Sequence, residues 1–283
     1  MIETEVSVET VTNRSGSVSE PSAPKGNERS SNGTMSLGYL VAHLLSFGIT
    51  AVIIKSFWQF ENASGALAFY GVYHRYGWNQ VVHFFGVPGI IWSLLIFMVH
   101  VPIPIVGDHH SLNYANCLAI CYNLYYLSID PFGAVLYAPV IHAMYASAEH
   151  LRQKDQAKAA GESKVSGNTS INNNNNTTNP SVPWYGTGKA LRFGLLVHVF
   201  CWYIQIHLGH EIIEGAKPAV LQGLGGALSV APLFAYYEGL WYLGINKELQ
   251  ESTQLLIDEY TQELCAERGI DFMRVCRTLI TQE

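Results

Sequence analysis

A histidine lies near each end of the segment YHRYGWNQVVH, residues 73–83, where a polar connector meets an apolar stretch. Ionisable side chains are costly in an apolar setting, so their presence there is a hypothesis of function. If a helix begins near Trp78, His83 lies about one turn into it and His74 can fold back toward it.

A second cluster of ionisable residues occupies WYIQIHLGHEIIE, residues 202–214, inside another apolar stretch. His207 and His210 are three residues apart, a spacing that places two side chains on one face of an α-helix. Glu214 is four residues beyond His210 and shares that face, whereas Glu211 lies slightly off it.

Imidazoles brought by two helices to one depth form a plausible transition-metal site. Imidazole suits iron, copper and zinc, and two histidines with one carboxylate and open positions favour non-haem Fe(II) with oxygen chemistry. The same histidines admit a structural interpretation, in which they hydrogen-bond between membrane helices of a scaffold without enzymatic activity. A further alternative is a di-iron membrane hydroxylase or desaturase. Its support is weak, because only GDHHS and HLGH resemble the histidine boxes of those enzymes.

The composition is that of a membrane protein. Of the 283 residues, 49% are hydrophobic and only 13% are charged, whereas a soluble domain carries about 25% charged residues. The net charge of −6 provides no basic surface, which excludes nucleic acid as a partner.

The elements that must position these histidines are apolar helices. Four apolar stretches approach the length of a membrane helix and two shorter ones could form a hairpin. They cover residues 37–54, 81–99, 190–208 and 227–243, and residues 114–127 and 132–146. We therefore predict an all-α, polytopic integral membrane helical bundle with about four to six membrane helices.

Composition divides the chain into five parts. We predict a disordered N-terminal tail, two membrane-helical parts separated by a charged and Asn-rich low-complexity insertion, and an amphipathic C-terminal helix. These parts are residues 1–35 (tail), 36–148 (first membrane part), 149–186 (insertion), 187–245 (second membrane part) and 246–283 (C-terminal helix).

The two histidine segments resemble those of a known family, the endoplasmic-reticulum 2-hydroxy fatty acid dioxygenases of fatty acid α-oxidation. The resemblance rests on YGVYHRYGWNQVVHFFGVP at residues 70–88 and on WYIQIHLGHEIIEGAKPAV at residues 202–220. It implies a multi-pass protein of the endoplasmic reticulum membrane. It also implies an Fe2+-dependent enzyme that uses O2 to shorten 2-hydroxy fatty acids, such as those from phytosphingosine breakdown, by one carbon.

The resemblance also implies roles for individual residues. The motif histidines are His74, His83 and His210, with Glu214 as the motif carboxylate, and His207 is a further candidate ligand. We expect Glu214 to support a ligand rather than to bind the metal itself.

Several neighbouring residues are candidates for contacting the substrate head group. Tyr70, Tyr73, Trp78 and Asn79 could line the entrance, and Lys217 could pair with the substrate carboxylate. An interfacial aromatic belt with a snorkelling lysine would explain the same residues without a ligand.

Overall fold

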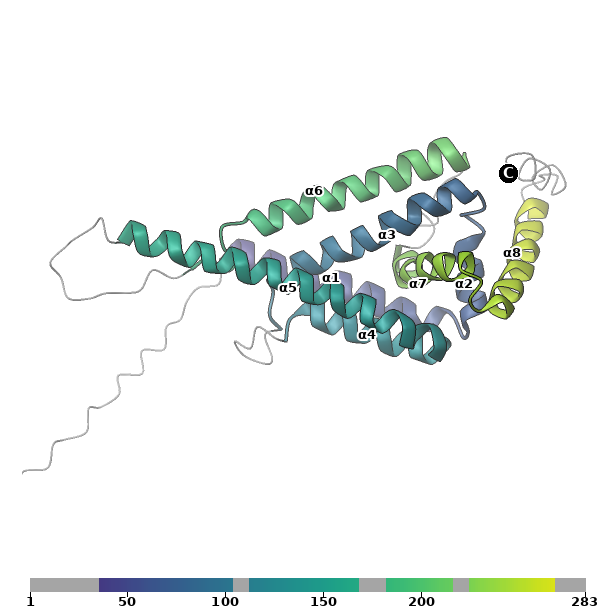
Figure 1. Cartoon of the computed structure of the whole chain (residues 1–283), viewed down its shortest axis with the longest axis horizontal. Coiled ribbons are helices and arrows are strands. Elements are labelled where there is room, and N and C mark those ends of the chain that lie inside the picture. The colour runs from purple at the N-terminus through teal and green to yellow at the C-terminus, as the bar shows by residue number, and fades with distance from the viewer. Residues whose placement is uncertain (1–35, 104–111, 168–181, 216–223, 268–283) are drawn as a thin grey trace, which may run out of the picture. The chain divides into compact units, whose positions relative to one another are not determined.

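The computed structural model describes residues 36–103, 112–167, 182–215 and 224–267 (Figure 1). These residues form helices and no strand, which confirms the predicted all-α class. The predicted N-terminal tail and Lys217 lie outside the described residues. The elements are α1 (Leu37–Ser56), η1 (Phe57–Gln59), α2 (Ala63–Gly71), α3 (Gly77–Met98), α4 (Tyr114–Ile129), α5 (Pro131–Gly167), α6 (Lys189–Tyr203), η3 (Ile204–Glu214), α7 (Leu224–Tyr242) and α8 (Lys247–Glu267).

Helix α3 is the centre of the bundle, because it packs on α5, α6, η3 and α7 (Figure 1). Two glycines let the continuous helix of α6 and η3 approach it closely. A Cβ at Gly86 would lie 2.7 Å from Nε2 of Gln205, and one at Gly89 would lie under 3.0 Å from Sγ of Cys201. Small residues at such positions are what allows helix backbones to pack closely in membranes.

The predicted hairpin is present as α4 and α5, which pack on each other and are joined at Asp130. Its core is aromatic, and the backbone of α7 accepts hydrogen bonds from two of its tyrosine hydroxyl groups. Tyr122 donates to the carbonyl of Leu228 at 2.8 Å, and Tyr126 donates to that of Ser229 at 2.9 Å. These bonds fix α7 inside the bundle, since a buried hydroxyl without a partner would be costly.

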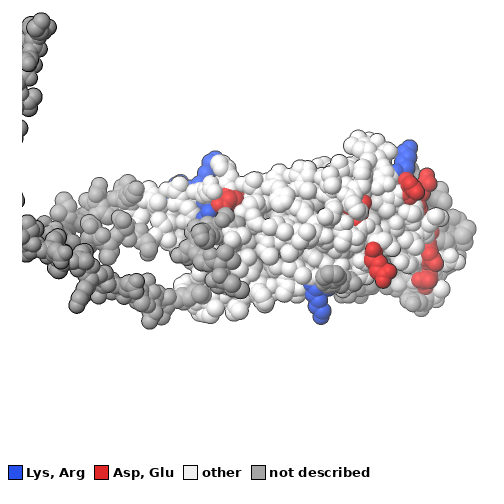
Figure 2. All heavy atoms as spheres, turned by 90° about the horizontal axis from the view of Figure 1, so that it is seen from below, with Lys and Arg blue, Asp and Glu red and all other residues white. Residues whose placement is uncertain are grey.

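Three of the described helices are long and apolar enough to cross a membrane: α1, α3 and the continuous helix of α6 and η3, Lys189–Glu214. Helix α7 does not belong to this group, and whether it or the α4–α5 hairpin crosses the membrane stays a prediction. On the face drawn in Figure 2, the charged residues gather mainly toward two ends, and the surface between them is largely uncharged. Both observations fit a membrane protein.

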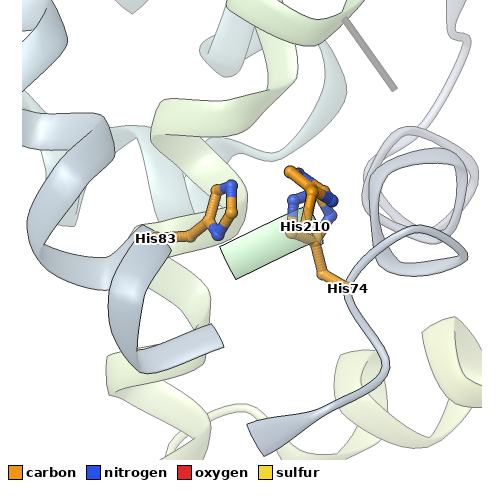
Figure 3. A group of neighbouring side chains, drawn as sticks. All are labelled: His74, His83 and His210. Atoms are coloured by element: carbon orange, nitrogen blue, oxygen red, sulfur yellow. The ribbon is translucent and has the colours of Figure 1, made fainter. Parts of the chain in front are cut away.

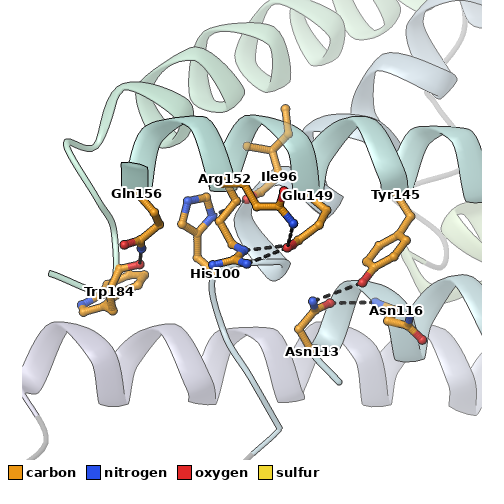
Figure 4. A network of polar contacts seen from close by, with 10 residues as sticks. Ile96, His100, Asn113, Asn116, Tyr145, Glu149, Arg152, Gln156 and Trp184 are labelled. Carbon is orange, nitrogen blue, oxygen red and sulfur yellow. Dashed lines mark hydrogen bonds and ion pairs between the residues drawn. The ribbon is translucent and has the colours of Figure 1, made fainter. Parts of the chain in front are cut away.

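The charged part of the insertion continues α5 to Gly167, while residues 168–181 lie outside the described part. A buried polar network ties this extension to the rest of the bundle (Figure 4). Within α5, Arg152 donates two hydrogen bonds to Glu149, at 2.6 and 2.9 Å. Nε2 of Gln156 donates to the carbonyl oxygen of Trp184, in the segment before α6, at 2.7 Å. Asp155, one turn further along, accepts from the backbone N–H of Gly188 at 3.0 Å.

Helix α8 confirms the predicted amphipathic helix over Lys247–Glu267. Its buried residues recur every four positions, at Thr253, Ile257, Thr261 and Cys265, and this face lies against α2. The remainder of the predicted helix, residues 268–283, is outside the described part.

Candidate metal centre

The first two histidines lie in the turn between α2 and α3 and near the start of α3. His74 lies in that turn, and His83 lies on the second turn of α3, which begins at Gly77, close to the predicted start. Nδ1 of His74 lies 2.7 Å from the carbonyl oxygen of Tyr70, and Nδ1 of His83 lies 2.9 Å from that of Asn79. A carbonyl can only accept, so each Nδ1 carries the proton and each Nε2 keeps its lone pair for a metal.

The third histidine, His210, comes from η3 and completes a compact group (Figure 3). The potential ligand nitrogens of His74, His83 and His210 all lie within 4.8 Å of one another. The ring centroids are 4.3 to 4.9 Å apart. The three residues are only 1%, 2% and 3% exposed.

Two nitrogens of this group are buried and lack a hydrogen-bond partner among the described residues: Nε2 of His74 and Nδ1 of His210. Unsatisfied buried polar atoms are rare in folded proteins and require an explanation, such as a bound ion. A transition metal would satisfy them, so the residues present fit a metal.

The imidazole of His74 favours the neutral form that metal binding requires. Burial holds the pKa of His74 well below its usual range, and positive charge on His83 or His210 would lower it further. A neutral imidazole does not have to lose a proton before it binds a metal.

The structure does not bring His207 to this group. Its side chain is 44% exposed and Nδ1 lies 2.6 Å from Oε2 of Glu211. The predicted shared face of His207 and His210 assumed an α-helix, whereas residues 204–214 form a π-helix. A π-helix has i→i+5 hydrogen bonds and more residues per turn, so side chains three residues apart diverge.

Glu214 lies beside the histidine group and holds the turn that carries His74. Oε1 accepts from the backbone N–H of Arg75 at 3.0 Å. Oε2 accepts from the N–H of Tyr76 at 3.4 Å and from Nδ2 of Asn79 at 2.9 Å. The residue at the N-cap of α3, Tyr76, makes no side-chain cap of its own, so this carboxylate supplies the acceptor that a helix N-terminus favours.

A glycine sets the distance between η3 and α3. A Cβ at Gly209 would lie under 3.0 Å from Oδ1 of Asn79 and 3.2 Å from Cε1 of His83. Asn79 is fully buried and Nδ2 donates to Glu214 at 2.9 Å, so its side chain cannot move aside without breaking that bond. Gly209 is therefore required for His210 to approach His83.

The residues predicted to contact the substrate differ in burial and in the groups that they contact. Tyr70 is buried and its ring stacks on that of His74, with centroids 4.0 Å apart. Asn79 is held by Glu214, Tyr73 is half-buried with its ring edge toward Phe69, and Trp78 is exposed.

Helix α7 contributes Phe234, whose ring packs beside the histidine group and which the sequence did not indicate. Phe234 is buried, with its ring centroid 5.8 Å from that of His74 and 4.9 Å from that of Tyr70. Nothing in the sequence around Phe234 marks it, because a single aromatic residue in an apolar helix is ordinary core composition.

A cavity of about 260 Å³ lies between α3, α7 and α8, and Phe234 lines it as well. Glu238, Trp241 and Thr253 also line it. Nε1 of Trp241 and Oγ1 of Thr253 are buried and have no partner among the described residues. Groups of this kind are usually satisfied by water.

Comparison with known protein families gives a match that includes this centre. A model of the family described as "2-hydroxy-palmitic acid dioxygenase Mpo1-like" matches residues 60–240, more than half of the chain, and this segment contains all three histidines. Neither the curated proteins nor the solved structures provide a match.

Proposed function

The chain belongs to the 2-hydroxy-palmitic acid dioxygenase Mpo1-like family, and we propose that it is an Fe(II)-dependent dioxygenase that shortens 2-hydroxy fatty acids by one carbon. We place it in the endoplasmic reticulum membrane as a multi-pass protein. The observation that carries the proposal is the buried group of His74, His83 and His210.

In this proposal the three imidazoles hold the iron, and no carboxylate ligand is needed. Iron, when bound, supplies the redox chemistry with O2. The substrate's carboxylate and 2-hydroxyl carry oxygen donors of the kind that such a metal would bind.

The chain's own residues orient the ligands and exclude water. The carbonyl groups of Tyr70 and Asn79 fix the tautomer and the direction of two imidazoles. The rings of Tyr70 and Phe234 cover His74, which keeps water from that side of the group. We assign Tyr73 and Lys217 to the binding of the substrate head group, as the sequence suggested.

The test uses the full-length protein purified anaerobically in detergent. We expect about one iron per chain, and conversion of 2-hydroxypalmitate with O2 to a product one carbon shorter. His210→Ala should lose both iron and turnover, whereas His207→Ala, altered on the outer face of the same helix, should keep both.

Two other outcomes would overturn the proposal. A product that keeps all its carbons would indicate a lipid hydroxylase or desaturase. Protein without stoichiometric iron, together with unchanged turnover in His210→Ala, would indicate a scaffold whose histidines are structural.

A further inference from the structure

Arg75, the residue directly after His74, is held from two sides. On one side its backbone N–H donates to Glu214 of η3 at 3.0 Å. On the other, its guanidinium reaches α8. Nη1 donates to Oγ1 of Thr261 at 2.5 Å, and Nη2 lies 3.3 Å from Oδ1 of Asp258. The side chain of Arg75 is 13% exposed and that of Asp258 is 48% exposed, so the connection is partly buried.

Helix α8 also fits closely against the end of α2, immediately before the turn. A Cβ at Gly71 would lie 3.0 Å from Cγ1 of Ile257 and closer still to its Cδ1. Near the other end of α2, the hydroxyl groups of Ser64 and Ser252 are 3.1 Å apart. Helix α8 therefore contacts α2 along its length and then the turn that carries His74.

Other restraints on the turn come from α2, α3 and η3. The carbonyl oxygens of Tyr70 and Gly71, in α2, accept from Nδ1 and from the backbone N–H of His74, at 2.7 and 3.0 Å. Nε2 of Gln80 in α3 donates to the carbonyl oxygen of His74 at 3.0 Å, and Glu214 in η3 accepts from two backbone N–H groups. Helix α8 is distant in sequence from the turn and contributes no histidine to the group, yet its side chains also hold the turn.

We propose that α8 is a positioning element of the metal centre, in which Asp258 and Thr261 hold Arg75 and so hold in place the turn that carries His74, while the carbonyl group of Tyr70 sets the direction of the imidazole. Helix α8 lies outside residues 60–240, the part that matches the family. The assignment therefore concerns a segment to which the family description gives no role. It rests on the proposed function only in requiring that His74, His83 and His210 bind a metal.

Groups that orient a metal ligand typically contribute about ten- to hundredfold to metal affinity or activity. Asp258→Asn with Thr261→Val removes the negative charge of one acceptor and the hydroxyl of the other while nearly preserving side-chain size. We expect this double variant to bind Co2+ about tenfold or more weakly than the unaltered protein. The unfolding temperature of the metal-free protein should change much less than the affinity does.

The experiment measures Co2+ affinity from the visible absorption of the full-length protein in detergent, and thermal unfolding without metal. Glu263→Gln is the matched control, because it removes one negative charge from the exposed side of α8. If Thr261→Val reduces the yield of folded protein, Asp258→Asn alone still tests the idea, since Asp258 is half-exposed. Its expected loss of affinity is smaller but still exceeds that of the control.

Unchanged Co2+ affinity in the double variant would overturn the assignment. So would an equal loss in Glu263→Gln, or a loss accompanied by a proportionate fall in metal-free stability. Co2+ affinity does not depend on the substrate. A protein that binds Co2+ through these histidines but leaves 2-hydroxypalmitate unchanged would overturn the proposed function and leave the role of α8 standing.

Discussion

Replacing Gly209 by alanine tests whether the close approach of η3 to α3 forms the metal centre. A Cβ there would lie under 3.0 Å from Oδ1 of Asn79, whereas ordinary contact begins at 3.4 Å. The two helices must therefore separate by more than about 0.4 Å at this point. Asn79 is fixed because its side-chain Nδ2 donates to Glu214 at 2.9 Å and its backbone carbonyl oxygen accepts from Nδ1 of His83 at 2.9 Å.

The size of the effect follows from the packing. Adding a methyl group to a tightly packed site typically costs about 1–3 kcal/mol. His210 is the residue after Gly209, and His83 is the other group that the new Cβ meets. The strain therefore falls on the geometry of the two ligands. Since about 1.4 kcal/mol is tenfold in an equilibrium constant, we expect Gly209→Ala to weaken Co2+ binding roughly tenfold or more.

The assay compares Co2+ affinity, 2-hydroxypalmitate turnover and metal-free thermal unfolding in Gly209→Ala and in a control, Gly48→Ala. Gly48 lies in α1, another membrane-type helix, and a Cβ there would meet nothing within 4 Å. The control should be neutral or should stabilise the helix by up to about 1 kcal/mol. If Gly209→Ala binds Co2+ and turns over substrate as the control does, the reasoning about the helix approach is wrong.

Three further predictions concern carboxylates and the outer histidine. His207→Ala should leave Co2+ affinity unchanged, because its imidazole pairs with Glu211 outside the group; a tenfold loss in a Co2+ titration would contradict this. Glu214→Ala should weaken Co2+ binding and lower the unfolding temperature together, because it releases the N–H groups of Arg75 and Tyr76; unchanged values of both would show that the carboxylate is dispensable. Glu238→Gln should leave Co2+ affinity unchanged, because Glu238 lines the separate cavity between α3, α7 and α8; a tenfold loss in the same titration would contradict this.

Much of the centre could be predicted from residue types and local spacing. His74 and His83 could be paired because a helix start between them brings one back toward the other, and α3 does begin at Gly77. The helical class followed from apolar stretches that are too long for strands and carry few charges. The roles of Phe234 and Arg75 could not be predicted, because they depend on how α7 and α8 pack against a turn distant in the sequence.

The placement of His207 depended on helix type, which the sequence does not reveal. Gln205 and Glu214 are nine residues apart, about two and a half turns of an α-helix, and would lie on opposite faces of one. In the structure both face α3: Gln205 meets Gly86, and Glu214 binds Asn79. Nine residues are close to a whole number of turns of the wider π-helix, which accounts for this arrangement.

The same period explains why η3 serves the metal centre. Along the helix, the residues that face α3 are Gln205, Gly209, His210 and Glu214, at spacings of four, one and four. Gly209 provides the close approach, His210 the ligand, and Glu214 the acceptor that holds the turn carrying His74. An α-helix of the same sequence would turn Glu214 away from the side on which Gln205 meets α3. The π-helix, an uncommon conformation that recurs at functional sites, is therefore the local feature that brings ligand and supporting carboxylate to one face.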